Sequence, residues 1–180
     1  SLDSGLFAPE EIEAHLRLVA HCQNGELARA LANGLSVPPF AIPDHVTFSG
    51  KAVFFPGTYS PDADQGGGAY GVLPPFDDDY EFIHIAHCLW RAKGGAAGAG
   101  AAAAAAGTAA GAASWLSAPS DGRPLLDRLL AAFAVPTCDP ATGAVVTTEE
   151  RRAVGFGFCD GIVLTGSLLF ATLLRERAAL

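Results

Sequence analysis

The stretch from Phe54 to Glu81 is rich in glycine and proline and leads directly into an apolar segment; it reads FFPGTYSPDADQGGGAYGVLPPFDDDYE. Glycine and proline oppose helix over most of it, while its aromatic rings favour an ordered loop. Long irregular loops inside compact domains are uncommon and are usually functional or disordered. Rings stack on C–H faces and carboxylates accept hydrogen bonds from hydroxyl groups, so this composition is typical of a site for a sugar or another polyol.

Composition limits the classes of partner. The chain has 180 residues, of which 50% are hydrophobic, which is enough for a single domain over 1–180 with a real core. Its formal net charge is −8 and it has no basic stripe, so nucleic acid and an anionic membrane surface are not expected partners. The longest apolar run, 161–174, is shorter than the ~20 residues of a membrane span, and we expect a soluble chain.

The pattern of apolar residues and helix-start signals predicts a mainly helical chain. The expected helices run from Pro9 to a stop at Asn24-Gly25, weakly over Glu26 to Ala32, from Asp77–Asp79 to about Lys93, from Ser120 or Asp121 to Pro136, and from Asp160 to the end. Short strands are expected around a Ser49-Gly50 turn and at Val145-Val146. Between these elements, residues 94–113 are almost pure alanine and glycine, which indicates a low-complexity insert.

The acidic cluster at the end of the long loop is the first candidate for chemistry. Asp77, Asp78, Asp79 and Glu81 place several carboxylates within about one helical turn. Hydrolysis of a glycosidic bond needs two carboxyl groups on opposite sides of the bond, one protonated and one ionised. Residues this close cannot all face a substrate, so the cluster supplies one or two site carboxylates, or else it caps the helix and complements its dipole.

A second loop of similar character precedes Asp160. Phe156 and Phe158 lie just before this aspartate, and they either flank a pocket or pack around a capped helix. In the first loop, Asp64 and Gln65 bind a polyol or hydrogen-bond within the loop, and Tyr59 stacks on a ligand or fills the loop.

Histidines and cysteines offer a weaker metal signal. His84, His87 and Cys88 have the i, i+3, i+4 spacing of metal ligands on a helix, but no nearby residue completes the set, so core or hydrogen-bonded histidines are favoured. The four cysteines, Cys22, Cys88, Cys138 and Cys159, are far apart in sequence and are interpreted as buried thiols. No metal and no cofactor is expected.

Several motifs together resemble the six-hairpin glycosidase-like superfamily of (α/α)6 toroids, which includes glucoamylase-like, rhamnosidase-like and debranching-type glucosidases. They are Ala-Ile-Pro-Asp-His-Val (41–46), Phe-Phe-Pro-Gly-Thr-Tyr-Ser (54–60), Asp-Gln-Gly-Gly (64–67), Leu-Pro-Pro-Phe-Asp-Asp-Asp-Tyr (73–80), Arg-Ala-Val-Gly-Phe-Gly-Phe-Cys-Asp (152–160) and Leu-Leu-Phe-Ala-Thr-Leu-Leu-Arg (168–175).

The resemblance implies an all-α fold of two concentric helix rings, with the site at one end of the barrel. It also implies hydrolysis of glycosidic bonds by a carboxylic acid and a carboxylate base, without a metal. Asp78 would be the leading catalytic carboxylate, with Asp77 and Asp160 behind it; Tyr59, Asp64, Gln65 and Phe158 would contact the sugar. Asp79 and Glu81 are poor catalytic candidates, because relatives tend to carry uncharged or aromatic residues there.

The predicted helices are too few for a complete barrel. About five helices are expected, whereas a toroid has twelve, so the chain would form an incomplete (α/α)6 toroid that is inactive alone and self-associates through uncovered helix faces. The alternative is a non-catalytic carbohydrate-binding or structural helical domain that associates with another chain.

Overall fold

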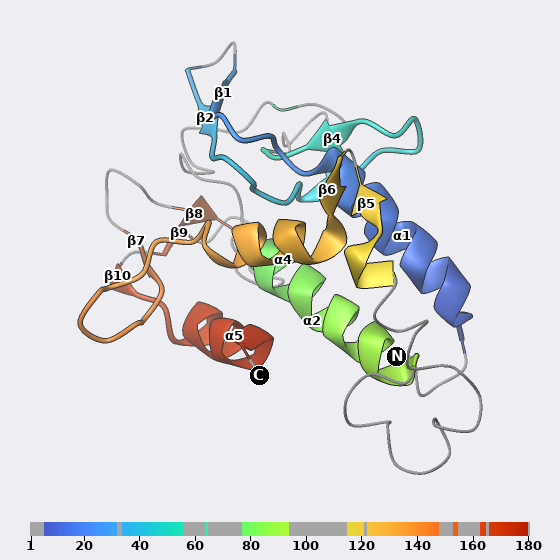
Figure 1. Cartoon of the computed structure of the whole chain (residues 1–180). Coiled ribbons are helices and arrows are strands. Elements are labelled where there is room, and N and C mark those ends of the chain that lie inside the picture. The colour runs from blue at the N-terminus through green and yellow to red at the C-terminus, as the bar shows by residue number, and fades with distance from the viewer. Residues whose placement is uncertain are drawn as a thin grey trace.

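The computed structural model describes residues 6–31, 34–55, 64, 77–93, 115–120, 122–147, 153–154, 163–164 and 166–179. This part of the chain is mainly helical, with short antiparallel strand pairs. Its long helices are α1 (Pro9–Cys22), α2 (Asp77–Ala92), α4 (Leu125–Phe133) and α5 (Leu169–Ala179) (Figure 1). None of the described helices is long and apolar enough to cross a membrane.

Helix α2 is the central element. It packs against α1, α4 and α5, as Figure 1 shows with α2 in green. Phe82 and Leu89 are buried and Trp90 is partly buried, whereas Ile85 is 41% exposed. The prediction of a helix from Asp77 that is buried on most sides is therefore confirmed, apart from the strip that contains Ile85.

Helix α1 begins and ends close to the predicted positions. Pro9 is its first residue, and the Glu11 carboxylate accepts a hydrogen bond from the backbone N–H of Ala8 at 2.7 Å. Leu16 is buried, and Ile12 and Val19 pack against the same cluster, so the predicted apolar face is the one that meets the core. The first turn thus combines a proline at N1 with a satisfied amide, both favourable at a helix start.

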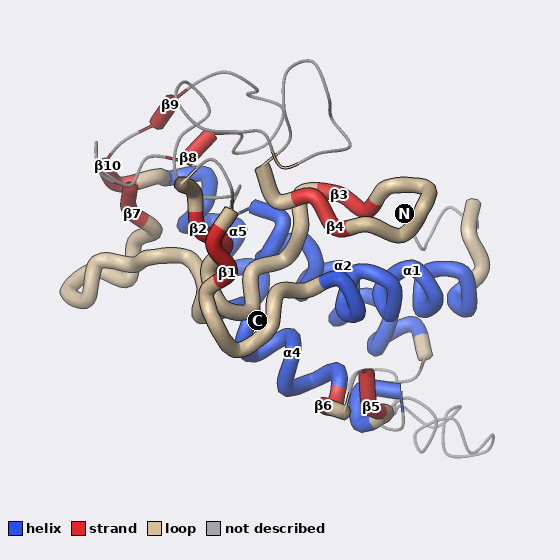
Figure 2. Tube along the Cα trace, turned by 90° about the horizontal axis from the view of Figure 1, so that it is seen from above, coloured by secondary structure: helices blue, strands red, loops and turns tan. Residues whose placement is uncertain are grey.

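The described residues contain more strands than the one or two expected, which corrects the all-α prediction. Five antiparallel pairs of two-residue strands are present: β1 (Arg29–Ala30) with β2 (Ser36–Val37), β3 (His45–Val46) with β4 (Ala52–Val53), β5 (Pro119–Ser120) with β6 (Arg123–Pro124), β7 (Val146–Thr147) with β10 (Gly166–Ser167), and β8 (Ala153–Val154) with β9 (Val163–Leu164). The β1–β2 and β3–β4 pairs lie on one side of the helices (Figure 1 and Figure 2). Two-residue strands are too short to show an alternating pattern of apolar and polar residues. Most of these strands were therefore not predicted from the sequence.

The helical patch predicted over Glu26 to Ala32 is wrong. Arg29 instead pairs with Val37, and the N–H of Leu31 donates to the carbonyl of Leu35 at 2.8 Å. A patch this short is not stable as an isolated helix, so pairing with the following segment decides its conformation.

The helix predicted from Asp160 to the end of the chain is confirmed over α5, Leu169–Ala179, but is wrong for the described residues before it. Residues Val163–Leu164 and Gly166–Ser167 are strands, and α5 begins only at Leu169. Gly166 has φ +86°, a left-handed conformation that ends any right-handed helix. Asp160 itself lies outside the described residues.

The start of α4 is later than predicted. Ser120 pairs with Arg123 around Gly122, whose φ is +79°, and Pro124 is the N-cap of a helix that begins at Leu125. Proline has no backbone N–H to donate, so it is well tolerated at the N-cap. The β5–β6 hairpin therefore comes directly before the helix, where the prediction placed the first helical turn. The Ala/Gly insert at 94–113 lies outside the described residues.

Three apolar clusters hold these elements together. The largest lies among α1, α2 and α4 and includes Ile42, which comes from the segment before β3. A second joins Tyr80 of α2 to Leu174 of α5, and a third contains Val37 and Phe54 beneath the first two hairpins. The start of α2 therefore lies where the helices meet the 41–46 segment.

Candidate carboxylate site

The first turn of α2 contains three consecutive carboxyl groups in different environments. Asp77 and Asp78 are partly buried, and Asp79 is completely buried. Glu81, one turn further, is bound by Arg177 of α5 at 2.6 Å near the surface. A helix N-terminus favours negative charge, but capping requires only one acidic side chain.

Asp78 is one of the two carboxyl groups in this turn that hold a proton more strongly than an ordinary aspartate. Burial raises its pKa well above the usual value of 3.8, and the negative charges of Asp77, Asp44, Asp79 and Glu81 raise it further. Desolvation and like charges both disfavour the ionised form. Asp78 therefore keeps its proton to higher pH than an ordinary aspartate, which is the direction of shift that a general acid requires.

Asp79 connects α2 to the segment that precedes β3. Its Oδ1 accepts a hydrogen bond from the backbone N–H of Ile42 at 3.0 Å, and its Oδ2 is buried with no hydrogen-bond partner among the described residues. Burial raises the pKa of Asp79 well above its usual value, although the amide of Ile42 acts in the opposite direction. The side chain of Asp79 is therefore buried and hydrogen-bonded to the 41–46 segment, and it is not an exposed reactive group.

Asp44 is the site residue that sequence reasoning missed. Its charge is close enough to Asp78 to raise the pKa of that residue, and its Oδ2 lies 2.7 Å from Nδ1 of His45. It lies in the Ala-Ile-Pro-Asp-His-Val motif that supported the family resemblance, which was the only available signal. Asp44 and Asp78 are 34 positions apart in the sequence, which conceals their proximity.

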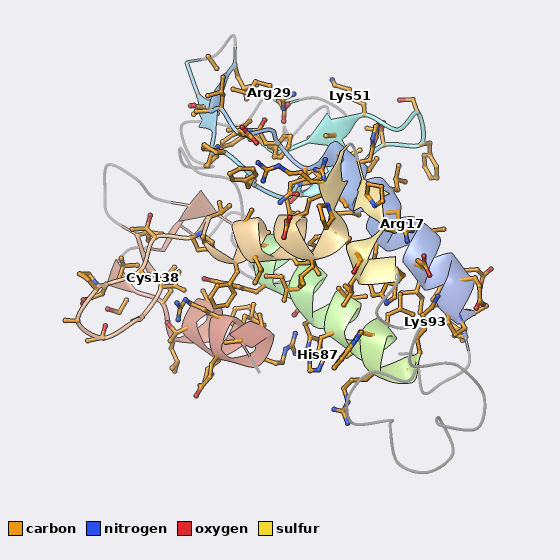
Figure 3. All side chains as sticks on the ribbon, in the orientation of Figure 1. Arg17, Arg29, Lys51, His87, Lys93 and Cys138 are labelled. Carbon is orange, nitrogen blue, oxygen red and sulfur yellow. The ribbon has the colours of Figure 1, made fainter. Side chains whose placement is uncertain are left out.

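Asp64 makes contacts inside the protein. Its Oδ1 accepts hydrogen bonds from the backbone N–H groups of Phe54 and Phe55 at 2.5 and 2.9 Å, and its Oδ2 lies 3.4 Å from Arg29. Arg29, labelled in Figure 3, also lies over the Phe54 ring at 4.9 Å. Of the two roles left open for Asp64, hydrogen bonding within the loop is the one for which contacts are present.

The remaining predicted site residues, Tyr59, Gln65, Phe158 and Asp160, lie outside the described residues. Within the described part, the structure brings Asp77 and Asp78 together with Asp44. Asp64 lies beside Phe54 and Phe55 instead.

On α2, His84 and Cys88 lie close together, and His87 lies apart from them. Nε2 of His84 lies 3.6 Å from Sγ of Cys88, whereas the ring of His87 packs on Trp90 at 5.8 Å between centroids. Burial lowers the pKa of His84, and so does the positive charge of Arg177. Among the described residues no group of three or more metal-binding side chains is present.

The cysteines differ from the expectation of buried thiols. The side chains of Cys22, Cys88 and Cys138 are partly exposed. Cys159 lies outside the described residues.

Comparison of the chain with protein-family models, with curated proteins and with solved structures gave no match.

Proposed function

We propose that this chain is a glycoside hydrolase-like protein that acts on a carbohydrate through carboxylate acid/base chemistry. One observation carries the proposal: Asp78 has a raised pKa because of burial and four neighbouring carboxyl groups. A carboxylic acid that stays protonated near neutral pH can donate a proton to the leaving oxygen of a glycosidic bond.

The second carboxyl group of the reaction has two described candidates. Asp44 reaches the site from the segment before β3, and Asp77 from the same turn of α2. Asp44 is the better partner for Asp78, because it comes from a different element and can lie across a substrate from α2. Its pairing with His45 holds the carboxylate in place.

The fold that we propose for this function is an incomplete (α/α)6 toroid, with α2 as an inner helix. The packing of α2 against α1, α4 and α5 supports an inner position. The acidic residues at its first turn also agree with a site built at the starts of inner helices.

The experiment is an assay of the chain against a panel of aryl glycosides, with and without added azide. Azide replaces a missing base or nucleophile by attacking the anomeric carbon, so it tests Asp78 even if the second carboxyl group is absent. We expect turnover in at least one condition, and a loss of about 100-fold or more in Asp78→Asn. Asp127→Asn, which changes an exposed carboxylate on α4, is the matched control and should keep full activity.

Two results would contradict the hydrolase proposal. One is full activity of Asp78→Asn. The other is saccharide binding with no turnover in either condition, which would favour a non-catalytic carbohydrate-binding domain.

We also propose self-association through apolar helix faces. Leu126 and Leu130 on α4 and Leu169 and Leu173 on α5 are 46%, 63%, 74% and 53% exposed. Apolar side chains that gather on helix surfaces favour association with a second copy. Analytical ultracentrifugation should show a dimer or larger species that Leu130→Glu or Leu169→Glu weakens; a monomer at all concentrations would contradict the proposal.

A further inference from the structure

The segment that delivers Asp44 to the candidate site is anchored at two adjacent backbone positions. The carbonyl of Ala41 accepts a hydrogen bond from the N–H of Asn24, just after α1, at 3.0 Å. The next residue, Ile42, donates its N–H to Asp79 Oδ1 of α2 at 3.0 Å, and its own side chain is buried in the main apolar cluster. The following residue, Pro43, has its own φ angle fixed by the proline ring, and it immediately precedes Asp44.

A carboxyl group at position 79 stabilises the core less than an apolar side chain would. Asp79 is 0% exposed, and within the part of the chain that the structure describes one of its carboxyl oxygens has no hydrogen-bond partner. A buried polar group without a partner destabilises a fold, and an apolar residue of similar size would avoid that cost. Its one hydrogen bond goes to the segment that places Asp44, 37 residues away along the chain.

We propose that Asp79 is a positioning residue, which through its hydrogen bond to Ile42 holds the 42–45 segment so that the carboxyl group of Asp44 lies beside that of Asp78. The inference rests on the proposed function for its relevance to catalysis. The geometric part of it does not require any catalytic activity.

The consequence concerns the protonation of Asp78. The charged groups that act on Asp78 are Asp77, Asp44, Asp79 and Glu81, and all four raise its pKa. If the hydrogen bond to Ile42 is lost, we expect Asp44 to move away from Asp78. The charge of Asp44 then raises the pKa of Asp78 less. Asp78 then ionises at lower pH and becomes a poorer proton donor.

The experiment is an NMR titration of the Asp78 carboxyl group in the full chain and in two variants at position 79. Asp79→Asn removes the charge and keeps an oxygen that accepts the Ile42 N–H, whereas Asp79→Ala removes both. We expect the pH at the midpoint of the Asp78 titration to fall further in Asp79→Ala than in Asp79→Asn. Equal shifts would show that Asp79 acts only through its charge and would overturn the positioning role.

A double-mutant comparison tests whether Asp79 acts through Asp44. In an Asp44→Asn background, Asp79→Ala should shift the Asp78 midpoint no further than Asp79→Asn does, because the carboxylate that is being positioned is gone. An undiminished difference between the two variants in that background would overturn the proposal.

A backbone variant covers the case in which Asp79→Ala does not fold. Replacing Ile42 by its α-hydroxy acid removes the N–H that donates to Asp79 and keeps every side chain; it also makes the Ala41 carbonyl a weaker acceptor for the N–H of Asn24. The Asp78 midpoint should again fall, and an unchanged midpoint in the folded ester variant would contradict the role of this hydrogen bond.

The titration also separates the two proposals. If no aryl glycoside is hydrolysed but the Asp78 midpoint moves as expected, the proposed function fails and the positioning role stands. If turnover depends on Asp78 but its midpoint is the same in Asp79→Ala as in Asp79→Asn, the function stands and the positioning role fails.

Discussion

The buried carboxyl group of Asp79 accepts a hydrogen bond from the backbone N–H of Ile42 at 3.0 Å, and so ties the first turn of α2 to the segment before β3. This contact joins two motifs that are separate in sequence. It also places a second acidic residue, Asp44, near the partly buried Asp78. Several consequences for stability can be measured independently of activity.

The stability contributed by Asp78 and Asp79 should fall as pH rises above about 3.8. Asp78 and Asp79 have raised pKa values in the folded chain, chiefly because of burial, against a usual value of 3.8. Above that pH the unfolded chain releases protons that the folded chain keeps, so these two groups lower the free energy of unfolding until the folded pKa values are passed. Urea unfolding over a pH series measures this slope.

The control for the pH dependence is a comparison of variants. The double variant Asp78→Asn with Asp79→Asn should gain stability relative to the unmodified chain as pH rises, whereas Asp127→Asn should follow the unmodified chain. A difference between the double variant and the unmodified chain that does not change with pH would contradict the assignment.

Loss of the Arg128 guanidinium should be strongly destabilising. Arg128 is buried, and it donates to the carbonyl of Ala20 at the end of α1 and to the carbonyl of Ser120 in β5, each at 2.8 Å. Arg128→Met should lower the free energy of unfolding by about 2–4 kcal/mol, because one buried and one partly buried carbonyl group lose a charged donor.

Two variants serve as comparisons for the effect of Arg128→Met: a lysine at position 128, and the loss of a surface arginine at position 123. Arg128→Lys should recover only part of the loss, since an ammonium group cannot reproduce the planar fork. Arg123→Met should cost less than about 1 kcal/mol, because the partner of Arg123, Glu26, is exposed. Equal effects at positions 123 and 128 in urea unfolding would show that the buried contacts do not matter.

The Glu13 carboxylate should make a modest, salt-dependent contribution to the free energy of unfolding. It binds Arg17 at 2.8 Å and also Lys93 at the end of α2, so it links two helices; Figure 3 labels both basic residues. Burial acts to raise its pKa, but the hydrogen bonds from Lys93 and Arg17 lower it overall. Its contribution is therefore present above pH 4.5 and is lost as the pH falls through the lowered folded value.

Glu13→Gln should cost about 0.5–1 kcal/mol near neutral pH, and less at high salt. Thermal or urea unfolding at two salt concentrations measures the effect. Glu10→Gln, an exposed neighbour on α1, serves as the control and should have little effect. A loss at position 13 that does not depend on salt would indicate packing rather than charge.

Asp64 should behave as a structural residue. Asp64→Ala removes an acceptor for the N–H groups of Phe54 and Phe55 and should lower the free energy of unfolding by about 1–3 kcal/mol. Asp64→Asn keeps an accepting oxygen and should cost less. If Asp64→Asn instead abolishes saccharide binding while stability is unchanged, as measured by calorimetry and urea unfolding, the residue is a ligand contact.

The elements predicted well from the sequence are those whose signal is local. Pro9 and the apolar spacing of Leu16 define α1, and the aspartates at 77–79 followed by apolar residues define α2. The β3–β4 hairpin follows from β-forming residues on both sides of Gly50, whose φ is +81°. In each case the residues within a few positions of one another determine the structure.

The elements predicted poorly depend on distant partners. Residues near Arg29 pair with the segment at Val37 instead of forming a helix, and Val163–Leu164 pairs with Ala153–Val154. Short strands have no periodicity, and their hydrogen bonds come from segments that the local sequence does not identify.

The sequence by itself determined the acidic start of α2 and the apolar helix that follows it, because helix capping and apolar spacing are properties of neighbouring residues. Only the tertiary structure decided which of these carboxyl groups has which environment. Asp79 is buried against Ile42, Asp78 lies near Asp44, and Glu81 reaches Arg177 at the surface. Burial and long-range charge depend on how distant segments pack, and those two effects set the protonation of each group.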